Sequence, residues 1–517
     1  MNTLNDFIVE YISERPPVHV ASTVISSLLA IFLIGKLLSF SQAFMYRSRV
    51  LKAVPTAPDG NWIVGHVIPM VTCVNRGMGA WDQISYWVTK AQDKTKLIKF
   101  RILDTHAVAF SDPVGLKRVF QTHYKIYEKD LKLSYHPFLP ILGTGLVTSD
   151  GDLWQKQRTL MGPALRVDVL DDIITIAKDS VDRLCAKLRP LQGSGRAVDM
   201  NEEFRLLTLQ VIGEAVLSMA PEECDKIFPK LYLPVMEEAN LRVLRPYRQY
   251  IPTPDWFKFR SRMSQLNSFL INFFRERWQS RKQGVQRPRK DILDRIMDSI
   301  EASGAKWDSS LERQLCYEVK TFLLAGHETS AAMLTWSLFE LSLCEEHMQK
   351  VRSEAELTFG SAEAEPSRRN VDAMSYTLSV LKEALRKYSV VPVVTRTLAK
   401  DDELLGHKVP AGTMVACVLQ GTHNMYEDPD QFRPDRFMPG GEYEQFDDAI
   451  KAYMFVPFIQ GPRNCLGQHL AMLEARVVLS LLCKRFRWKT VHGSAQGIRH
   501  PTVIPVGPLE GMPMVLE

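Results

Sequence analysis

The chain has 517 residues, of which 45% are hydrophobic and 24% are charged. These proportions are ordinary for a globular protein and exclude a disordered or fibrous chain. A formal net charge of +5 is too small a surplus to indicate nucleic-acid binding, but it suits an acidic partner or an anionic membrane surface. Eight cysteines in 517 residues are too sparse for a disulfide-rich scaffold, and none form a C-x-x-C pair, so zinc-finger spacing is absent and a reducing, cytosolic compartment is favoured.

The first element predicted along the chain is a membrane-spanning helix. Residues 18–35 contain no Asp, Glu, Lys or Arg, and apolar residues continue after Lys36. About 20 apolar residues are needed to cross a bilayer core, so we expect an anchor over residues 18–46 and a lumenal segment over residues 1–17. A cleaved signal peptide or a plastid transit peptide is the alternative, and the acidic residues near the N-terminus argue against both.

The residues that follow the anchor predict its orientation. Arg47, Arg49 and Lys52 place the bulk of the chain in the cytosol by the positive-inside rule. Residues 47–60 are basic and proline-rich, so they are expected to form a linker. Residues 61–517 are then expected to form one large domain.

Amphipathic patterns with a helical period dominate that domain. They predict long helices over residues 169–188, 201–219, 257–283, 310–345 and 468–485. Short apolar runs between them predict strands over residues 97–100, 107–110 and 414–419. The expected fold class is therefore mainly α with small β-sheets.

The strongest chemical motif surrounds Cys465, where the chain reads FIQGPRNCLG before a helical pattern begins. A thiol just before a helix N-terminus meets free N–H groups that stabilise its thiolate. Gly461 and Gly467 permit tight turns and the close approach of a flat ligand. Arg463 offers a fork for a carboxylate, and Phe458 can shield the sulfur from water. The motif indicates a thiolate ligand to a planar cofactor with acid groups, and a haem has that shape.

This string resembles the haem-binding signature F-x-x-G-x-R-x-C-x-G of the cytochrome P450 family at every defined position. The resemblance runs from about residue 55 to the C-terminus and is weakest over residues 187–306. It implies the cytochrome P450 fold and heme b (iron protoporphyrin IX) with Cys465 as the axial thiolate ligand. A buried structural cysteine is the alternative for an isolated motif, but further motifs follow in the order of the family.

One of these motifs concerns a structural network. Glu383 and Arg386 resemble the E-x-x-R pair of the family, and the helical spacing of three places both side chains on one face. The segment FRPDRF resembles the P-E-R-F segment, with Asp435 in place of the usual Glu. The resemblance implies that Arg436 completes a buried Glu–Arg–Arg network with a structural role, since buried charges need full pairing.

A second group of motifs is implied to hold the haem propionates. Trp154 and Arg158 resemble the W-x-x-x-R motif, and a spacing of four places them on one helix face. The indole N–H and the guanidinium fork can both reach a propionate. Arg396, in the segment PVVTR, is implied to make a third propionate contact. An ordinary core aromatic is the alternative for Trp154 alone.

The segment AGHETS, which starts at Ala325, resembles the oxygen-activating motif A-G-x-[DE]-T-[TS] of the family. Gly326 costs ~1 kcal/mol in mid-helix relative to alanine, so it needs a reason. We expect that Ala325 and Gly326 leave room for oxygen and substrate against the haem. The resemblance implies that Glu328 relays protons and that Thr329 is the last donor. His327 is expected to be structural.

The resemblance implies a haem–thiolate monooxygenase that receives electrons from NADPH-cytochrome P450 reductase, with cytochrome b5 or a ferredoxin as other donors. The thiolate pushes electron density toward oxygen and favours O–O cleavage. A single-pass protein of the endoplasmic reticulum membrane is expected, with a plastid membrane as the alternative. Basic residues that could steer an acidic partner are Lys156, Lys484, Arg485 and Arg487.

The substrate is expected to be lipophilic, because the segments expected to line the pocket, 133–147, 322–333 and 390–394, are largely apolar. Terpenoids or carotenoids, sterols and fatty acids fit, and residues 245–259 suit a loop at the membrane interface. The sequence AGHETSAAMLTW is similar to the corresponding segment of carotenoid hydroxylases and fatty-acid ω-hydroxylases. Many ω-hydroxylases carry a Glu that ester-links the haem where Ala325 stands, so a covalent haem is not expected.

Two other functions remain open from the sequence. A P450 isomerase or dehydratase acts on lipid hydroperoxides without a reductase, and such enzymes often lack the acid–alcohol pair that Glu328 and Thr329 provide. A haem-binding carrier or gas sensor needs neither a membrane-anchored access channel nor a proton relay. If turnover depends on NADPH, the protein is a monooxygenase and not a hydroperoxide isomerase. If Thr329→Ala uncouples electron use from product formation, the protein is a monooxygenase and not a carrier or sensor.

Overall fold

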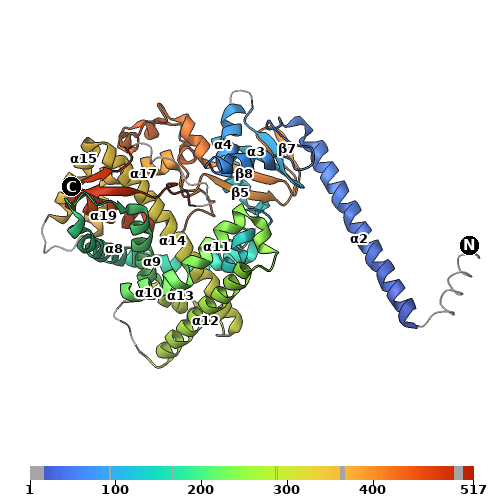
Figure 1. The fold of residues 1–517 in the computed structure, drawn as a ribbon, viewed down its shortest axis with the longest axis horizontal. Helices are drawn as coiled ribbons and strands as arrows, with labels where there is room; N and C mark the ends of the chain where they lie inside the picture. The colour runs from blue at the N-terminus through green and yellow to red at the C-terminus, as the bar shows by residue number, and fades with distance from the viewer. Residues whose placement is uncertain are drawn as a thin grey trace, which may run out of the picture.

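The structure is a computed structural model that describes residues 17–91, 95–165, 167–285, 287, 289–360, 367–493 and 505–517. The predicted fold class is confirmed, because helices form most of the body and the strands form small sheets (Figure 1). The helices are α2 Pro17–Val50, α3 Val67–Asn75, α4 Ala80–Ala91, α5 Pro113–Lys117, α6 Leu139–Leu142, α7 Gly151–Met161, α8 Val167–Leu188, α9 Met200–Leu217, α10 Pro221–Leu231, α11 Leu233–Leu244, α12 Pro254–Lys282, α13 Ile292–Ala302, α14 Ser309–Leu343, α15 Glu345–Phe359, α16 Arg368–Asp372, α17 Ser375–Tyr388, α18 Lys451–Met454 and α19 Gln468–Arg485.

The strands form three sheets. The largest has the order β1-β2-β8-β5-β3, in which β2 and β8 run parallel and the other pairs run antiparallel. The others are β4-β10-β9 and the β6–β7 pair. The strands are β1 Ile98–Ile102, β2 Thr105–Phe110, β3 Tyr127–Lys129, β4 Val198–Asp199, β5 Val393–Leu398, β6 Asp402–Leu404, β7 His407–Val409, β8 Met414–Val418, β9 Trp488–Thr490 and β10 Pro513–Leu516.

The largest sheet is buried on both faces. Side chains alternate along a strand, so Val108 and Val415 pack into one apolar cluster while Ala109 and Ala416 pack into another. Trp87 of α4 belongs to the second cluster. Because every residue of β2 and β8 is buried, the runs at 107–110 and 414–418 are continuous apolar stretches rather than alternating ones.

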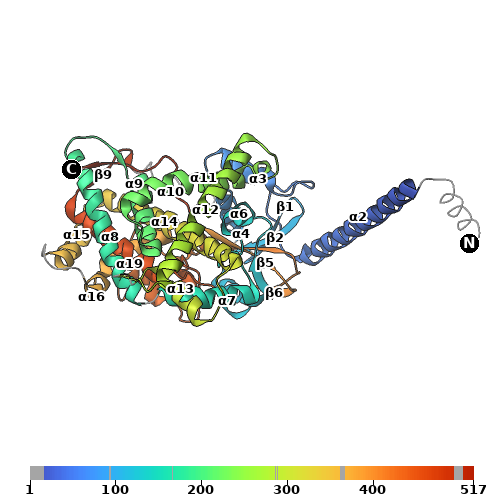
Figure 2. The same cartoon turned by 90° about the horizontal axis from the view of Figure 1, so that it is seen from below.

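Helix α14 is the central element of the body. It has 35 residues, and the Asp308 carboxylate caps its first turn by accepting from the backbone N–H groups of Ser310 and Leu311. Helices α9 and α19 pack along it, and Figures 1 and 2 place it in the middle of the helical layer. Its middle is buried on most sides, in the main core cluster. A helix buried on nearly all sides keeps a fixed position, which suits a scaffold for a site.

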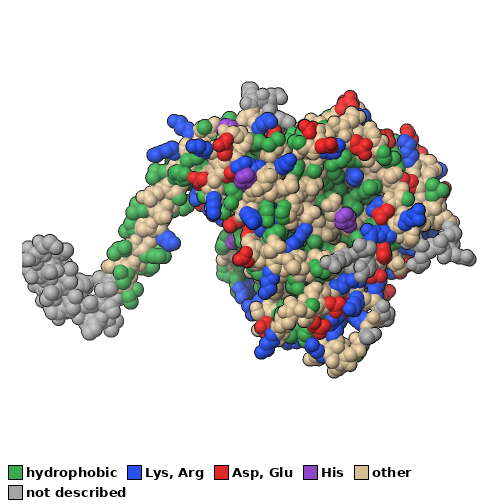
Figure 3. Space-filling model, turned by 180° about the vertical axis from the view of Figure 1, so that it is seen from behind, with side chains coloured by type: hydrophobic (Ala, Val, Ile, Leu, Met, Phe, Trp, Pro, Cys, Tyr) green, Lys and Arg blue, Asp and Glu red, His purple; other side chains and the backbone are tan. Residues whose placement is uncertain are grey.

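Helix α2 projects away from the body in both views (Figures 1 and 2). Residues 25–53 have a mean hydropathy of 1.8 over the most apolar window, none of which is buried, so this helix is long and apolar enough to cross a membrane. Basic side chains gather where it meets the body, as Figure 3 shows. The predicted segment over residues 1–17 lies outside the described residues except for its last one.

The expectation that residues 47–60 form a linker is wrong. Helix α2 continues to Val50, and Leu51 and Val54 are buried in the apolar cluster of the largest sheet. The Arg47 guanidinium donates to the carbonyl of Ala411 at 3.0 Å, and Ser48 lies 2.8 Å from His106 Nε2. Leu51 and Val54 therefore attach this segment to the core, while Pro55 and Pro58 remain exposed.

The contacts of the predicted Glu–Arg–Arg network are present between two residues of α17 and Arg436. Arg386 makes two hydrogen bonds of 2.7 Å to the Glu383 carboxylate, and Arg436 Nε lies 3.3 Å from it. Glu442, which sequence reasoning missed, also pairs with Arg436. The backbone N–H of Arg433 donates to Glu383 as well, at 2.8 Å. All charges of the buried triad are thus satisfied, which buried ion pairs require.

We predict that Glu383→Ala lowers the free energy of unfolding by about 3–5 kcal/mol, because it leaves two buried guanidinium groups without their carboxylate. Urea denaturation followed by circular dichroism measures this change. Glu346→Ala is the control, because it breaks an exposed pair with Lys350, and it should leave the unfolding midpoint in place. Equal effects of both substitutions would contradict the role given to the network.

Candidate functional site

The loop before α19 presents Cys465 in an unusual environment. Of the eight cysteines, all of which are described, Cys465 is the exposed one, yet loss of water contact raises the pKa of its thiol. Protein therefore surrounds the sulfur and leaves one side of it open. The backbone N–H of Gly467 and the charge of Arg158 both lower the thiol pKa and oppose the effect of burial. Both favour the thiolate that a metal ligand requires.

Two predicted glycines of this loop have different physical roles. Gly461 has a φ of 77°, and a Cβ there would lie 2.2 Å from the carbonyl oxygen of Phe120. This glycine is therefore required by the backbone that passes beside it. Gly467 has nothing within 4 Å in the direction of a Cβ, so open space lies over it. Phe458, half-buried, accepts a backbone hydrogen bond of 2.8 Å from Cys465.

The structure brings Trp154 and Arg158 of α7 to the cysteine loop. The Arg463 guanidinium lies over the Trp154 ring, 4.4 Å from its centroid. Arg158 donates to the backbone and side-chain oxygens of Asn464 at 2.9 and 2.6 Å. Asn464 was missed by sequence reasoning, although it stands next to Cys465. Helix α7 and the loop thus form one wall with two guanidinium groups.

A third guanidinium group, Arg396 of β5, lies directly opposite Lys129 of β3 across the sheet. Like charges in such a pair are destabilising. The charges of Arg396 and Arg463, with burial as the larger cause, lower the pKa of Lys129 far below its usual value, and Asp150 only partly opposes them. Arg396 is buried and has no carboxylate within ion-pair distance among the described residues.

These residues fit a ligand with acid groups. Arg158, Arg396 and Arg463 are cationic, Lys129 lies beside them, and Asp150 pairs with Arg463 at 2.5 Å. Arg463 Nε is buried and has no hydrogen-bond partner among the described residues. Buried cations in excess of carboxylates are costly unless an anion compensates them. The two propionates of a haem would supply that charge beside an open thiolate, so the residues fit the cofactor that the motif implies.

The oxygen-activating motif forms a partly open stripe on α14. Ala325 is exposed in mid-helix and Thr329 is half-buried, whereas the preceding and following turns are mostly buried. The Thr329 hydroxyl donates to the carbonyl of Ala325 at 2.5 Å, four residues earlier. An accessible stripe on a central helix borders a space inside the body, which is where a cofactor and substrate would lie.

The physical reason for Gly326 differs from the predicted one. A Cβ at this position would lie 2.7 Å from the side chain of Ile212 of α9. The glycine is therefore needed so that α9 and α14 can pack closely, and not to make room for oxygen. Because α9 and α14 form the most extensive helix contact of the body, the cost of a mid-helix glycine is offset by that packing.

Glu328 faces α9 rather than the open stripe. Its carboxylate is buried, and it lies 3.6 Å from the Arg205 guanidinium. Burial raises the pKa of Glu328, and Arg205 lowers it in part. Arg205 also pairs with the exposed Glu202 at 2.9 Å, so a line of charged groups leads from Glu328 to the surface. Sequence reasoning missed Arg205.

His327 is a core residue. Its side chain is fully buried, packs against the Tyr232 ring at 5.6 Å and lies 3.2 Å from the carbonyl of Leu323. Burial, with the nearby charge of Arg205, lowers its pKa to about 3. His327 is therefore neutral at physiological pH, and these contacts agree with a structural role.

The four basic residues expected to steer a partner divide into two groups. Lys484 donates to the carbonyl of Phe359 at 2.7 Å, and Arg485 pairs with Asp182, so both are used within the chain. Of these four residues, Lys156 and Arg487 are the two that are exposed for contact with a partner.

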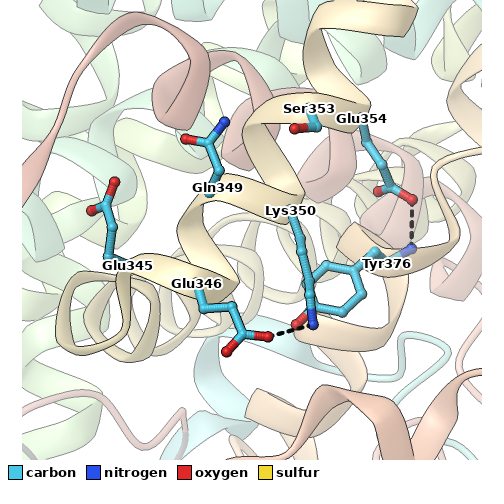
Figure 4. Close-up of a pocket in the computed structure, with 7 residues that line it drawn as sticks. All are labelled: Glu345, Glu346, Gln349, Lys350, Ser353, Glu354 and Tyr376. Atoms are coloured by element: carbon cyan, nitrogen blue, oxygen red, sulfur yellow. Dashed lines mark hydrogen bonds and ion pairs between the residues drawn. The ribbon is translucent and has the colours of Figure 1, made fainter.

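The surface hollow in Figure 4 lies between α15 and the first turn of α17. Glu346 pairs there with Lys350 at 2.8 Å, and the Glu354 carboxylate accepts from the backbone N–H of Tyr376 at 2.7 Å (Figure 4). Glu354 thereby caps the helix that carries Glu383. The Glu354 contact holds α15 against α17, which is a structural role, and we assign no chemistry to this hollow.

Comparison with known proteins agrees with this geometry. The family described as Cytochrome P450 matches residues 55–510. The chain belongs to the cytochrome P450 family. The human Ultra-long-chain fatty acid omega-hydroxylase is 28% identical over 480 residues, 88% of this chain and 87% of that protein. Leukotriene-B4 omega-hydroxylase 3 of Mus musculus is 28% identical over 466 residues, 86% of each chain. Cytochrome P450 97B2, chloroplastic, of Glycine max is 28% identical over 431 residues, 73% of each chain.

The predicted family, fold and enzyme class are confirmed by these matches, and the chain is a P450 monooxygenase. The family implies a haem–thiolate cofactor. No group of three or more His, Cys, Asp or Glu side chains in the described part of the chain is placed to hold a metal ion. A single thiolate beside an anion-binding wall fits a metal that a cofactor carries.

We predict that iodoacetamide modifies Cys465 first in the haem-free protein, because it is the exposed cysteine. Arg158→Ala should slow this reaction near neutral pH, since loss of the positive charge raises the thiol pKa. A rise of half a pKa unit lowers the thiolate fraction about threefold. Mass spectrometry of tryptic peptides measures the rates, and Lys156→Ala, an exposed cation on the same helix, is the control. Equal rates in all three proteins would refute the assigned contact.

Proposed function

We propose that this P450 binds heme b through the Cys465 thiolate and inserts one oxygen atom from O2 into a long-chain lipid. The observation that carries the proposal is an exposed cysteine in a loop lined by several guanidinium groups, one of which, that of Arg158, opposes the effect of burial on the thiol pKa. When bound, the iron with its thiolate ligand supplies the chemistry of O2 activation. The remaining steps are the work of side chains that bind, orient and move protons.

The cationic wall would fix the cofactor in one orientation. Arg158, Arg396 and Arg463 would hold the propionates, with Trp154 as the surface on which Arg463 rests. Bidentate guanidinium contacts add geometric specificity to the charge attraction. Phe458 and the Gly467 N–H would adjust the electron density at the sulfur by limiting water and by hydrogen bonding.

Proton delivery would begin at the surface and end at Thr329. Glu202 and Arg205 form a charged line to the buried Glu328 carboxylate. The raised pKa of Glu328 moves its titration toward neutral pH, where a carboxyl group can both accept and release a proton. Thr329 releases its bond to Ala325 and presents its hydroxyl to the open stripe. One oxygen atom enters the substrate and the other leaves as water with two protons and two electrons.

The electrons would come from NADPH-cytochrome P450 reductase, with cytochrome b5 or a ferredoxin as other donors. Lys156 and Arg487 are the exposed cations that remain for steering an acidic donor. The chain is a membrane-anchored P450, since α2 can span a bilayer. We assign it to the endoplasmic reticulum with its body in the cytosol. A plastid membrane is the second candidate, because one relative is described as chloroplastic.

The substrate we propose is a fatty-acid-like lipid, hydroxylated near its terminal carbon. Two of the relatives above are described as ω-hydroxylases, of an ultra-long-chain fatty acid and of leukotriene B4. The stripe on α14 is apolar at Phe322 and Ala325, which suits a hydrocarbon chain. Reconstitution with reductase, NADPH and hexadecanoic acid, followed by mass spectrometry of the products, tests this function. Product from a lipid hydroperoxide without NADPH would instead support the isomerase.

We predict that Cys465→Ala removes the reduced carbon monoxide spectrum of a haem–thiolate, because no other described cysteine is exposed. Difference spectroscopy of purified full-length protein measures this. Cys344→Ala, at a half-buried cysteine, is the matched control and should keep the spectrum. A thiolate spectrum that persists in Cys465→Ala would show that another residue binds the iron.

We also predict that Thr329→Ala lowers the fraction of NADPH used for product by at least about tenfold, because a positioned proton donor typically contributes more than that. NADPH consumption, peroxide release and product are measured together. Thr335→Ala is the control, because Thr335 makes the same type of bond to a carbonyl four residues earlier on α14 but is fully buried. Unchanged coupling in Thr329→Ala would remove the proposed proton role.

A further inference from the structure

A buried carboxyl group holds the segment between α6 and α7 against the central helix. We name residues 143–149 the roof segment. The Glu318 carboxylate of α14 accepts a hydrogen bond of 3.1 Å from the backbone N–H of Leu146. It accepts a second, of 2.8 Å, from Gln314, which itself exchanges hydrogen bonds with Thr144 at 2.9 and 3.0 Å. One acidic side chain thus fixes the roof directly and also orders its neighbour.

The roof segment fits closely on this part of α14. Gly143 has a φ of 48°, and a Cβ there would lie 2.3 Å from the Tyr317 ring. A Cβ at Gly145 would lie 3.0 Å from the Thr321 hydroxyl oxygen. Both glycines are therefore required by contact with the helix. The segment has a single packed position that depends on the surface around Glu318.

The other end of the roof segment reaches the cysteine loop. Arg463 donates to the carbonyl of Ser149 at 3.0 Å and to the Asp150 carboxylate at 2.5 Å. Helix α7 then begins at Gly151. The roof segment therefore connects α14 at Glu318 to the cysteine loop at Arg463.

Glu318 also lies in register with the open stripe of α14. Positions 318, 322, 325 and 329 follow helical spacings of four, three and four residues, which place them on one side of the helix. Glu318 is 1% exposed, and burial raises its pKa to about 7. The groups that oppose this shift are the Leu146 N–H and Gln314, and no charged group contributes. A buried acid without a cation is costly, so its use in holding the roof offers a reason for its presence.

We propose that Glu318 is a positioning residue that holds the roof segment over the open stripe of α14 and so sets how tightly a long lipophilic ligand is bound above Thr329. The proposal rests on the proposed function, which it extends to a determinant of substrate binding. Glu318 touches neither the cofactor wall nor Thr329 through any hydrogen bond or ion pair found among the described residues. It acts through the roof.

The test compares a long and a short haem ligand in full-length holoprotein. 1-Dodecylimidazole carries a chain that reaches beyond the haem, whereas imidazole does not. Glu318→Ala should raise the dissociation constant of 1-dodecylimidazole about tenfold, as expected when a buried N–H loses its partner, and change that of imidazole less than about twofold. Glu318→Gln should stay within about threefold of the wild type, because an amide oxygen can still accept from Leu146. Spectral titration measures all values.

Glu312→Ala is the matched control on the same helix. Glu312 is also a buried carboxylate with hydrogen-bonding partners, Arg275 at 2.8 Å and Trp307 at 3.0 Å, but it does not contact the roof segment. It should leave both dissociation constants unchanged. Equal weakening by Glu312→Ala and Glu318→Ala, or equal weakening of both ligands, would overturn the proposal in favour of a general loss of stability.

Hydrogen exchange tests the roof without reference to haem. Amides of residues 143–149 should exchange at least about tenfold faster in Glu318→Ala than in Glu312→Ala. Equal exchange would overturn the proposal even if the protein proves to be a fatty-acid hydroxylase. Failure of the wild type to bind either imidazole would refute the proposed function and leave this measurement to decide the role of Glu318. If Glu318→Ala does not fold, Gln314→Ala, which removes the bonds to Thr144, should give about threefold faster exchange, and unchanged exchange would again overturn the proposal.

Discussion

Excess positive charge inside the body constrains much of the structure around the cysteine loop. Arg158, Arg396 and Arg463 come from three separate elements, and Asp150 is the carboxylate that pairs with Arg463. Burying an unmatched cation costs several kcal/mol even after the protein relaxes around it. The arrangement is reasonable only if an anionic group completes it. The sheet edge, α7 and the loop are therefore positioned for a ligand, and the same geometry favours the thiolate by placing Arg158 beside Cys465.

Different sides of helix α14 have different packing requirements. Toward α9 it must pack closely, and Gly326 meets this need by admitting Ile212. Toward the cofactor it must stay open, and Ala325 and Thr329 leave accessible surface there. Glu328 is directed to the packed side, so the acid is separated from the open stripe by the helix itself, while Thr329 bonds back to the helix. Proton movement would then depend on small changes in α14 rather than on a preformed line of hydrogen bonds.

Sequence reasoning succeeded where a motif or a period reports one physical requirement. The long helices were predicted to within a few residues, as α19 and α14 show, because the apolar period reports burial. The Cys465 loop was found because its residue types serve one ligand. Long-range partners were missed: Lys129, Asn464 and Arg205 are unremarkable in sequence, and only the fold brings them to the site. The linker over residues 47–60 was predicted from prolines and charges, although Leu51 and Val54 carried the decisive signal.

The attachment of residues 47–60 to the body affects how a lipid could reach the site. If residues 47–60 were flexible, the anchor would leave the body free to rotate above a membrane. Instead, Leu51 and Val54 are buried in the cluster that also packs against β2 and β8, and Arg47 is bonded to Ala411. A helix fixed at one end in a sheet core limits the orientations of the body relative to the bilayer that it spans. The segment that follows carries Trp62, which is 85% exposed, so the surface nearest the anchor is partly apolar. If α2 spans a bilayer, a rigid anchor and an apolar adjacent surface would together keep the same side of the body toward the lipid.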